Sequence, residues 1–296
     1  MDGIKRFLIA LSIAGCGGGG GGGMPTDGGD GPGTGHDADI DGMPAPANDR
    51  CANATTISIA SVHSEISATA AGANADLAAP CGTAGTPDVF FKFTLTRREV
   101  IYADTFGATG NTTLYFASSC VAARTASTTP GDAVCSTGAC GTSQSQVVAL
   151  LDPGTHYLVL AGQGAAMIHF QHAEVGNGTV THLAAGSSTS TGTTSSDSGL
   201  LYACEAGGAE NAYWWHSCPS AAGGAFVAST CTGTDFDTMM SLQMPGADQV
   251  LCDDDSCSVQ SSIGTNIPAG AGLFVLAVDG FSTAKHGNYT LSVTRP

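Results

Sequence analysis

The sequence predicts an all-β protein made of two tandem, jelly-roll-like β-sandwich domains. Glycine accounts for 42 of the 296 residues, and much of the remainder is Ala, Ser and Thr, a composition that favours strands and tight turns over long helices. Short apolar segments also alternate with polar residues at the two-residue period of a half-buried strand, between turn residues.

A repeat predicts that there are two such domains. The motif C-x4-C occurs as Cys135 to Cys140 and again as Cys252 to Cys257, and 252 − 135 and 257 − 140 are both 117. Each copy is followed by a glycine-led apolar strand, 154–160 and 270–276. Because a repeat of about 120 residues is an ordinary domain size, we expect domains at 48–180 and 181–296.

The amino terminus resembles a bacterial lipoprotein signal at residues 1–15. Lys5-Arg6 precedes an apolar run, 7–14, that is too short to span a bilayer and is followed by Ile-Ala-Gly-Cys16. The resemblance implies that Cys16 is acylated and anchors the protein to a lipid membrane, and Gly17 after the cysteine favours the outer membrane. The alternative is an ordinary secretory signal with an unrelated cysteine.

Residues 16–47 are predicted to be a disordered tether. Seven consecutive glycines, 17–23, are followed by Gly, Asp and Pro with almost no large apolar side chain, so no core can offset the entropy of ordering the chain.

The strands of the first domain are expected around 57–59, 89–93, 100–102, 112–116, 147–151, 157–160 and 167–170. The second domain repeats this order, with Asn111-Thr112 matching Asp237-Thr238, and closes with the alternating strand 289–293. The Ser/Thr-rich segment 186–199 is either a flexible linker or, in part, a polar edge strand.

Several motifs of the second domain together resemble the pre-peptidase C-terminal type of β-sandwich module. These motifs are Cys204, 213–215, Phe236-Asp237-Thr238, Cys252-Asp253-Asp254, 273–276, Asp279-Gly280 and Gly287-Asn288-Tyr289. The resemblance implies an accessory module of the kind found on secreted bacterial proteases and on tandem surface lipoproteins. No peptidase domain accompanies the modules in this sequence.

Aspartates of the second domain suggest a weak calcium site. Calcium prefers several carboxylate and carbonyl oxygens, and five acidic side chains fall at strand ends or in loops of this repeat: Asp237, Asp253, Asp254, Asp255 and Asp279. The alternative is an ordinary solvated acidic turn. The first repeat carries neutral residues at the equivalent positions, so we expect only the second domain to respond to calcium.

A second candidate site is the aromatic run Tyr213-Trp214-Trp215. Adjacent strand residues point to opposite faces, so one tryptophan should face the core while the other is free to stack on a sugar or peptide or is covered by a loop.

The remaining ten cysteines divide five and five between the domains. Either one disulfide crosses between the domains or each domain keeps a free thiol, and spacing alone does not fix the pairing. The preferred pairs are Cys51 with Cys81 and Cys120 with Cys135.

Charge and motifs restrict the function. The formal charge is −16, which argues against nucleic acid, because that binding depends on Lys and Arg. No G-x-S-x-G, H-E-x-x-H or phosphate-binding glycine loop is present. We therefore expect a membrane-anchored surface lipoprotein that is not an enzyme and binds a glycan, a peptide or an envelope partner. The alternatives are a passive structural component of the envelope and a hydrolase with an unrecognised site.

Overall fold

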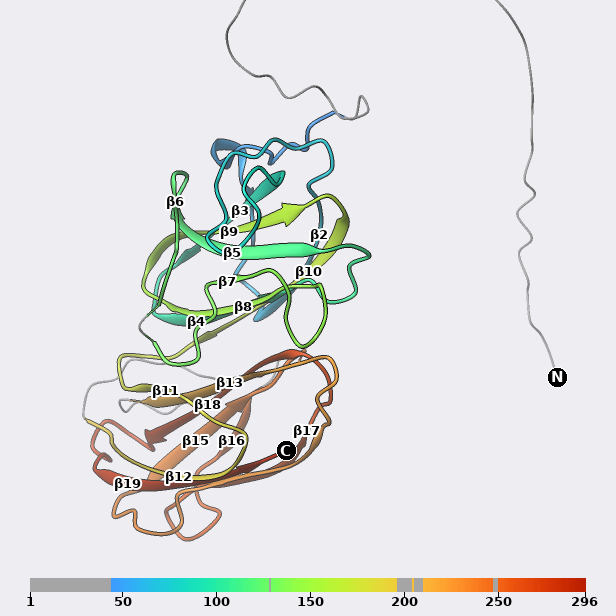
Figure 1. The fold of residues 1–296 in the computed structure, drawn as a ribbon. Coiled ribbons are helices and arrows are strands. Elements are labelled where there is room, and N and C mark those ends of the chain that lie inside the picture. The colour runs from blue at the N-terminus through green and yellow to red at the C-terminus, as the bar shows by residue number, and fades with distance from the viewer. Residues whose placement is uncertain (1–43, 128, 196–203, 205–209, 247–249) are drawn as a thin grey trace, which may run out of the picture. The chain divides into compact units, whose positions relative to one another are not determined.

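The computed structural model describes residues 44–296 except 128, 196–203, 205–209 and 247–249. The predicted signal peptide, Cys16 and most of the predicted tether lie outside these residues. The described residues all belong to one compact unit. They form four β-sheets and one short 3₁₀ helix, Cys51–Asn53, which confirms the predicted all-β class (Figure 1).

The first sandwich consists of two sheets. The first sheet has the order β1-β3-β9-β5-β6, with β7 also paired to β5, and the second has the order β2-β10-β4-β8. Their bounds are β1 (Thr55–Thr56), β2 (His63–Thr69), β3 (Asp88–Leu95), β4 (Glu99–Asp104), β5 (Thr112–Ser119), β6 (Ala122–Ala123), β7 (Cys135–Ser136), β8 (Gln146–Leu151), β9 (Gly154–Gly162) and β10 (Ala165–Glu174).

The second sandwich repeats this plan. One sheet has the order β11-β13-β18-β15-β16 and the other β12-β19-β14-β17. Their bounds are β11 (Val180–His182), β12 (Gly186–Thr193), β13 (Asn211–Ser217), β14 (Gly224–Ser229), β15 (Thr238–Gln243), β16 (Leu251–Asp253), β17 (Ser262–Ile267), β18 (Gly272–Gly280) and β19 (Asn288–Arg295). Residues 186–193 are thus the polar edge strand, paired antiparallel to β19, rather than a linker.

Each sandwich has its own core. In the first, Phe93, Leu114 and Leu160 from one sheet pack with Ile101 and Phe170 from the other. In the second, the core includes Trp215, Phe274 and Leu291. Burial of apolar side chains from both inner faces is what holds a β-sandwich together.

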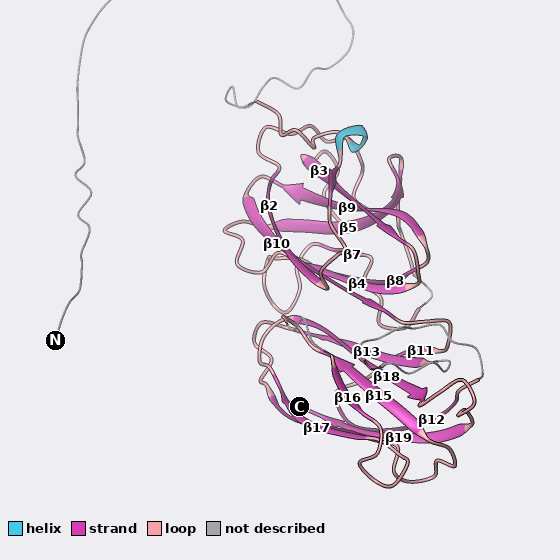
Figure 2. Ribbon diagram, turned by 180° about the vertical axis from the view of Figure 1, so that it is seen from behind, coloured by secondary structure: helices cyan, strands magenta, loops and turns pink. Residues whose placement is uncertain are grey.

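A third apolar cluster joins the two sandwiches. It combines side chains of β4, β8, β10 and the residue after β10 with side chains of β13 and β18: Val100, Tyr102, Val148, Ala173, Val175, Ala212, Trp214, Leu273 and Val275. Every residue of β4 and β18 is consequently buried, because each strand packs against a core on both of its faces. Figure 2 shows from behind that β4 and β8 of the first sandwich lie next to β13 and β18 of the second.

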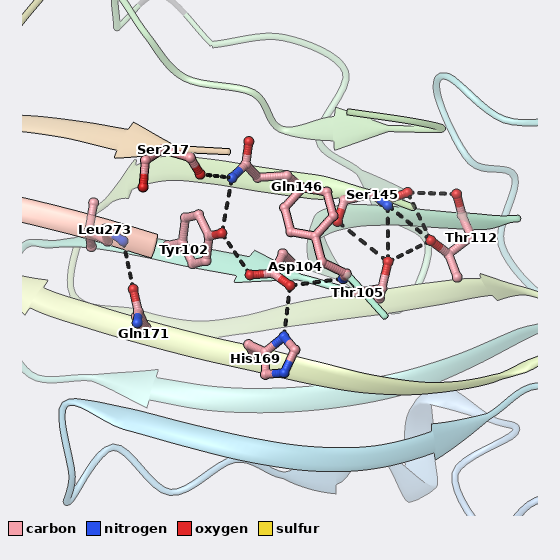
Figure 3. Close-up of polar contacts among 11 residues, drawn as sticks. Tyr102, Asp104, Thr105, Thr112, Ser145, Gln146, His169, Gln171, Ser217 and Leu273 are labelled. Carbon is pink, nitrogen blue, oxygen red and sulfur yellow. Dashed lines mark hydrogen bonds and ion pairs between the residues drawn. The ribbon is translucent and has the colours of Figure 1, made fainter. Parts of the chain in front are cut away.

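Polar contacts and one disulfide reinforce this junction. The side-chain amide of Gln146 donates to the carbonyl of Ser217 at 2.8 Å, and the amide N–H of Leu273 donates to the side-chain oxygen of Gln171 at 2.6 Å (Figure 3). The Cys140–Cys218 disulfide crosses between the sandwiches. The sequence left a crossing bridge and two free thiols as alternatives, and the structure has the crossing bridge.

The preferred disulfide pairs were wrong. The structure pairs Cys51 with Cys120 and Cys81 with Cys135, and it also contains Cys204–Cys252 and Cys231–Cys257. Cys135 lies on β7, which pairs with β5, and this places it beside the loop of Cys81. Strand pairing therefore selected the partners, which spacing along the chain could not do.

Candidate functional site

A hydrogen-bonded cluster of buried hydroxyl groups forms the base of the candidate site. Thr105 directly follows β4, Thr112 begins β5 and Ser145 directly precedes β8 (Figure 3). The two threonine hydroxyls are 2.6 Å apart, and the amide N–H of Ser145 donates to both of them at 3.0 Å. Because buried polar groups that satisfy one another's hydrogen bonds resist displacement, this cluster holds the ends of three strands in fixed positions.

A polar pocket of about 340 Å³ lies at this end of the first sandwich. Its wall is made of small, hydroxyl or amide side chains: Cys81, Gly82, Thr83, Thr86, Asn111, Thr112, Thr113, Thr137, Ala161 and Gly162. Gly162 has a φ of 150°, and a Cβ there would lie 2.9 Å from the carbonyl oxygen of Asn111. Glycine thus allows the two strands to approach each other at the pocket edge.

The loop beside the pocket is held at two points. Cys81 is bonded to Cys135, and the buried carboxylate of Asp88, at the start of β3, accepts the amide N–H groups of Asp76 and Leu77, each at 3.0 Å. Burial raises the pKa of Asp88, while these hydrogen bonds act in the opposite direction. The pocket is therefore largely formed before a ligand arrives.

The pocket is electrically neutral. Among the described residues, its lining carries hydroxyl groups of threonine and the amide of Asn111 but no ionisable side chain. Hydroxyl and amide groups can both donate and accept hydrogen bonds. The arrangement suits a small uncharged ligand that is itself rich in hydroxyl groups.

The aromatic residues predicted to stack on a ligand do not reach the surface. Trp214 and Trp215 point to opposite faces, but Trp214 is 0% exposed in the junction cluster and Trp215 is 1% exposed in the second core. Tyr213 is 4% exposed, with its hydroxyl 2.8 Å from that of Tyr289. The stacking prediction is therefore wrong, because the face expected to meet solvent is covered by the first sandwich.

The predicted calcium ligands are distributed over separate local contacts. Asp253 accepts the hydroxyl of Ser256 and the amide N–H of Ser262, each at 2.6 Å, and Asp237 lies 3.6 Å from the ammonium group of Lys285. Met240 pairs with both Asp253 and Val278, so these residues share one sheet face, and Asp279 lies on the other.

Asp254 and Asp255 remain in the turn after β16. Within the described ranges, no three His, Cys, Asp or Glu side chains come close enough to hold one metal ion. The calcium site remains a prediction, and its residues do not converge on one point.

The sequence missed the neutral pocket itself. In the repeat, Asn111 and Thr112 are the neutral counterparts of Asp237 and Thr238. The carboxylate of Asp237 indicated a candidate site in the second domain, whereas the neutral pair indicated none in the first. Threonine is too common in strands for its presence alone to indicate a site. What identifies the pocket is the meeting of four separate chain segments, 81–86, 111–113, Thr137 and 161–162.

Comparison with known proteins supports a binding fold. Residues 47–159, most of the first sandwich, match a T9SS-associated family model described as "Galactose binding domain-like". This agrees with the β-sandwich class and with a non-enzymatic binding module, while the pre-peptidase C-terminal resemblance stays a prediction. Together with five disulfides, it indicates an extracytoplasmic, cell-surface protein.

Solved structures show only distant likeness. The CUB1-EGF-CUB2 domains of rat MASP-1 are 8% identical, with 81% of this chain and 99% of that chain covered and a TM-score of 0.22. A putative secreted protein from Eubacterium rectale is 10% identical, with 71% and 70% covered and a TM-score of 0.20. Such scores carry no functional inference. No curated protein matches the sequence.

Among the described residues, no helix is long and apolar enough to cross a membrane.

Proposed function

We propose that the protein is a lipid-anchored surface lipoprotein that binds a neutral saccharide without catalysis, in the pocket of the first sandwich. The observation that carries this proposal is the neutral, hydroxyl- and amide-lined pocket of about 340 Å³ inside the segment that matches the galactose-binding-like family. Its volume is near the lower end of the range for small-molecule sites, which suits one or two sugar residues.

The chemistry of the wall supports a saccharide over a charged ligand. Sugar hydroxyls exchange hydrogen bonds readily with threonine hydroxyls and an asparagine amide. The described residues of the lining include no ionisable group that would bind a phosphate or carboxylate. The rigid base of Thr105, Thr112 and Ser145 limits the entropy that is lost when a ligand binds.

Binding to a glycan array, followed by titration calorimetry with the best ligand, tests the proposal. Asn111→Ala and Thr113→Val each remove one polar group from the pocket, and each should weaken binding by about two- to tenfold. Thr189→Val is the matched control, since Thr189 is an exposed β12 residue of the second sandwich.

Two outcomes would redirect the assignment. If no glycan binds, the passive structural role becomes the better account, and if the pocket variants bind as well as the unchanged protein, the pocket is not the site. A panel of hydrolase substrates tests the enzyme alternative, for which we expect no turnover.

The membrane anchor rests on the sequence and has its own test. Ile13-Ala14-Gly15-Cys16 has the lipobox pattern, and we propose acylation of Cys16 and display at the outer membrane. Metabolic labelling with a fatty acid should mark the protein and not its Cys16→Ser variant. Equal labelling of both would exclude this attachment site.

A further inference from the structure

A second hollow lies at the junction of the two sandwiches, away from the neutral pocket. It has a volume of about 410 Å³ and is lined by His63, Asp104, Phe106, His169, Gln171, Pro219, Pro245, Gly246 and residues 268–271. Both sandwiches contribute to it, and we refer to these residues as the junction cleft. Its chemistry differs from that of the neutral pocket, because it combines ionisable groups with apolar walls.

Three ionisable side chains form a row beside this cleft. His169 on β10 pairs directly with Glu65 on β2 and with Asp104 on β4. Directly opposed residues of antiparallel strands point to the same face of a sheet. An imidazole therefore lies between two carboxylates on one face.

Asp104 fixes how His169 is presented (Figure 3). Its buried carboxylate accepts the Tyr102 hydroxyl at 2.6 Å, the Phe106 amide N–H at 2.9 Å and the Nδ1–H of His169 at 2.8 Å. With Nδ1 engaged, the neutral imidazole carries its lone pair on Nε2. The His169 side chain lines the cleft and is 34% exposed, so its imidazole is accessible to a ligand.

The rest of the cleft supplies apolar surface. Phe106 is partly exposed and offers an aromatic ring, and Pro219, Pro245 and Pro268 face it from the second sandwich. None of the described residues that line the cleft from the second sandwich carries a charge. A complementary ligand is thus a cationic hydrogen-bond donor on a hydrocarbon stem.

We propose that the junction cleft binds an alkylammonium group, a primary amine carried on an aliphatic chain. The ammonium donates to Nε2 of His169, lies near the carboxylate of Glu65 and contacts the ring of Phe106, where cation–π attraction adds to binding. The stem packs along the prolines. The excess of 25 acidic over 9 basic residues attracts cationic partners over longer range.

A proton competes with the amine for the same nitrogen. The hydrogen bond to Asp104 raises the pKa of His169 above its ordinary value, with burial opposing and the charges of Asp104 and Glu65 adding to the rise. Besides Asp104 and His169, the described lining contains one more titratable group, His63. Amine binding should therefore be strongest at alkaline pH and should weaken as the pH falls through the pKa of His169.

The test is titration calorimetry of the full chain with Nα-acetyl-lysine methylamide at pH 8.5 and pH 5.5. The amine should bind at pH 8.5 and at least tenfold more weakly at pH 5.5, while its ε-acetylated form should not bind at either pH. Glucosamine in place of the lysine probe distinguishes an amino sugar from a protein side chain as the natural source.

Three variants locate the site. Glu65→Gln should weaken binding by up to about fivefold, Phe106→Ala by about two- to thirtyfold, and His169→Gln should remove most of the pH dependence. His286→Gln and Asp235→Asn are matched controls at exposed positions of the second sandwich and should leave binding unchanged.

Equal binding of the ε-acetylated probe, binding that strengthens toward pH 5.5, or no response to Glu65→Gln and Phe106→Ala would overturn the proposal. The saccharide proposal fails or succeeds separately, because Asn111→Ala and Thr113→Val leave the junction cleft intact.

Discussion

Both sandwiches contain the same cluster of two threonines and a serine, but they differ in the chain segment that lies beside it. Thr230, Thr238 and Ser261 repeat the contacts of Thr105, Thr112 and Ser145: the threonine hydroxyls are 2.8 Å apart, and the amide N–H of Ser261 donates to both, at 3.1 and 3.0 Å. In each sandwich the second threonine pairs with a glycine that ends a long strand, Gly162 or Gly280.

The segment that follows this glycine differs between the copies. In the first sandwich, two residues separate β9 from β10, and the pocket stays open. In the second, residues 281–287 fold back: the amide N–H of Phe281 donates to the carbonyl of Asp237 at 3.1 Å, and Lys285 pairs with the Asp237 carboxylate. The cluster of two threonines and a serine is therefore common to both sandwiches, whereas the segment beside it differs between them.

The largest expected loss of stability comes from replacing the two adjacent tryptophans. Trp215 lies in the core of the second sandwich, and Trp214 lies in the cluster that joins the two sandwiches. Trp215→Ala should destabilise the second sandwich by about 3–5 kcal/mol, as expected for a buried aromatic. Trp214→Ala should cost a similar amount but should also uncouple the sandwiches, because Trp214 lies in the cluster they share.

Differential scanning calorimetry checks this difference. A single transition should split into two with Trp214→Ala and not with Trp215→Ala. The control is Trp214→Phe, which should cost less than Trp214→Ala because an aromatic ring keeps part of the apolar packing. The indole N–H of Trp214 has no hydrogen-bond partner among the described residues, so its loss should add little. A single transition for Trp214→Ala would contradict the shared-core account.

The crossing disulfide should have the next largest effect. Replacing Cys140 and Cys218 together by serine should lower the free energy of unfolding by about 2–4 kcal/mol. The double replacement of Cys231 and Cys257 should cost about 1 kcal/mol less, because it opens a separation of 26 residues rather than 78. Denaturant unfolding measures both, and equal losses would show that chain entropy is not the main term.

One histidine in each sandwich should make the stability of the protein depend on pH, His216 on the acid side and His172 on the alkaline side. Burial, with His182 and Arg295 adding to it, lowers the pKa of His216 to about 4, so stability should fall as the pH drops from the ordinary value of about 6.5 toward 4. Burial alone would lower the pKa of His172, but its hydrogen bond to Glu99 and the Glu99 charge outweigh that and raise it. The stability this pair provides should be lost as the pH rises through that raised value.

Melting temperatures between pH 4 and pH 9 check both signs. His216→Gln should flatten the acid side of the profile and His172→Gln the alkaline side. If His216→Gln instead flattened the alkaline side and His172→Gln the acid side, the two pKa shifts would have the opposite directions.

Calcium should have the smallest effect. The aspartates of the second sandwich lie on different faces and in separate contacts, so we expect 10 mM calcium to move the melting temperature little relative to chelator. A rise of several degrees that Asp237→Ala abolishes would instead establish the predicted metal site.

The sequence determined the all-β class, the two-fold repeat, the edge strand at 186–193 as one of two alternatives, and the need for either a crossing disulfide or free thiols. These features follow from local alternation, turn residues and counting. It also contained a signal of the junction that can be recognised afterwards. The strand 272–278 is continuously apolar where 289–293 alternates, and a continuous run is expected of a strand buried on both faces.

Only the tertiary structure decided the disulfide partners, the burial of both tryptophans and the two candidate sites. Asn111, Thr113 and Gly162 are brought together by the pairing of β5 with β9, and Asp104 meets His169 through β4 and β10. The physical reason is that a sheet joins residues by hydrogen bonding between distant strands, so neighbourhood in space is set by register and layer packing. Spacing along the sequence indicates local conformation, but it does not determine which residues of distant strands pair with each other.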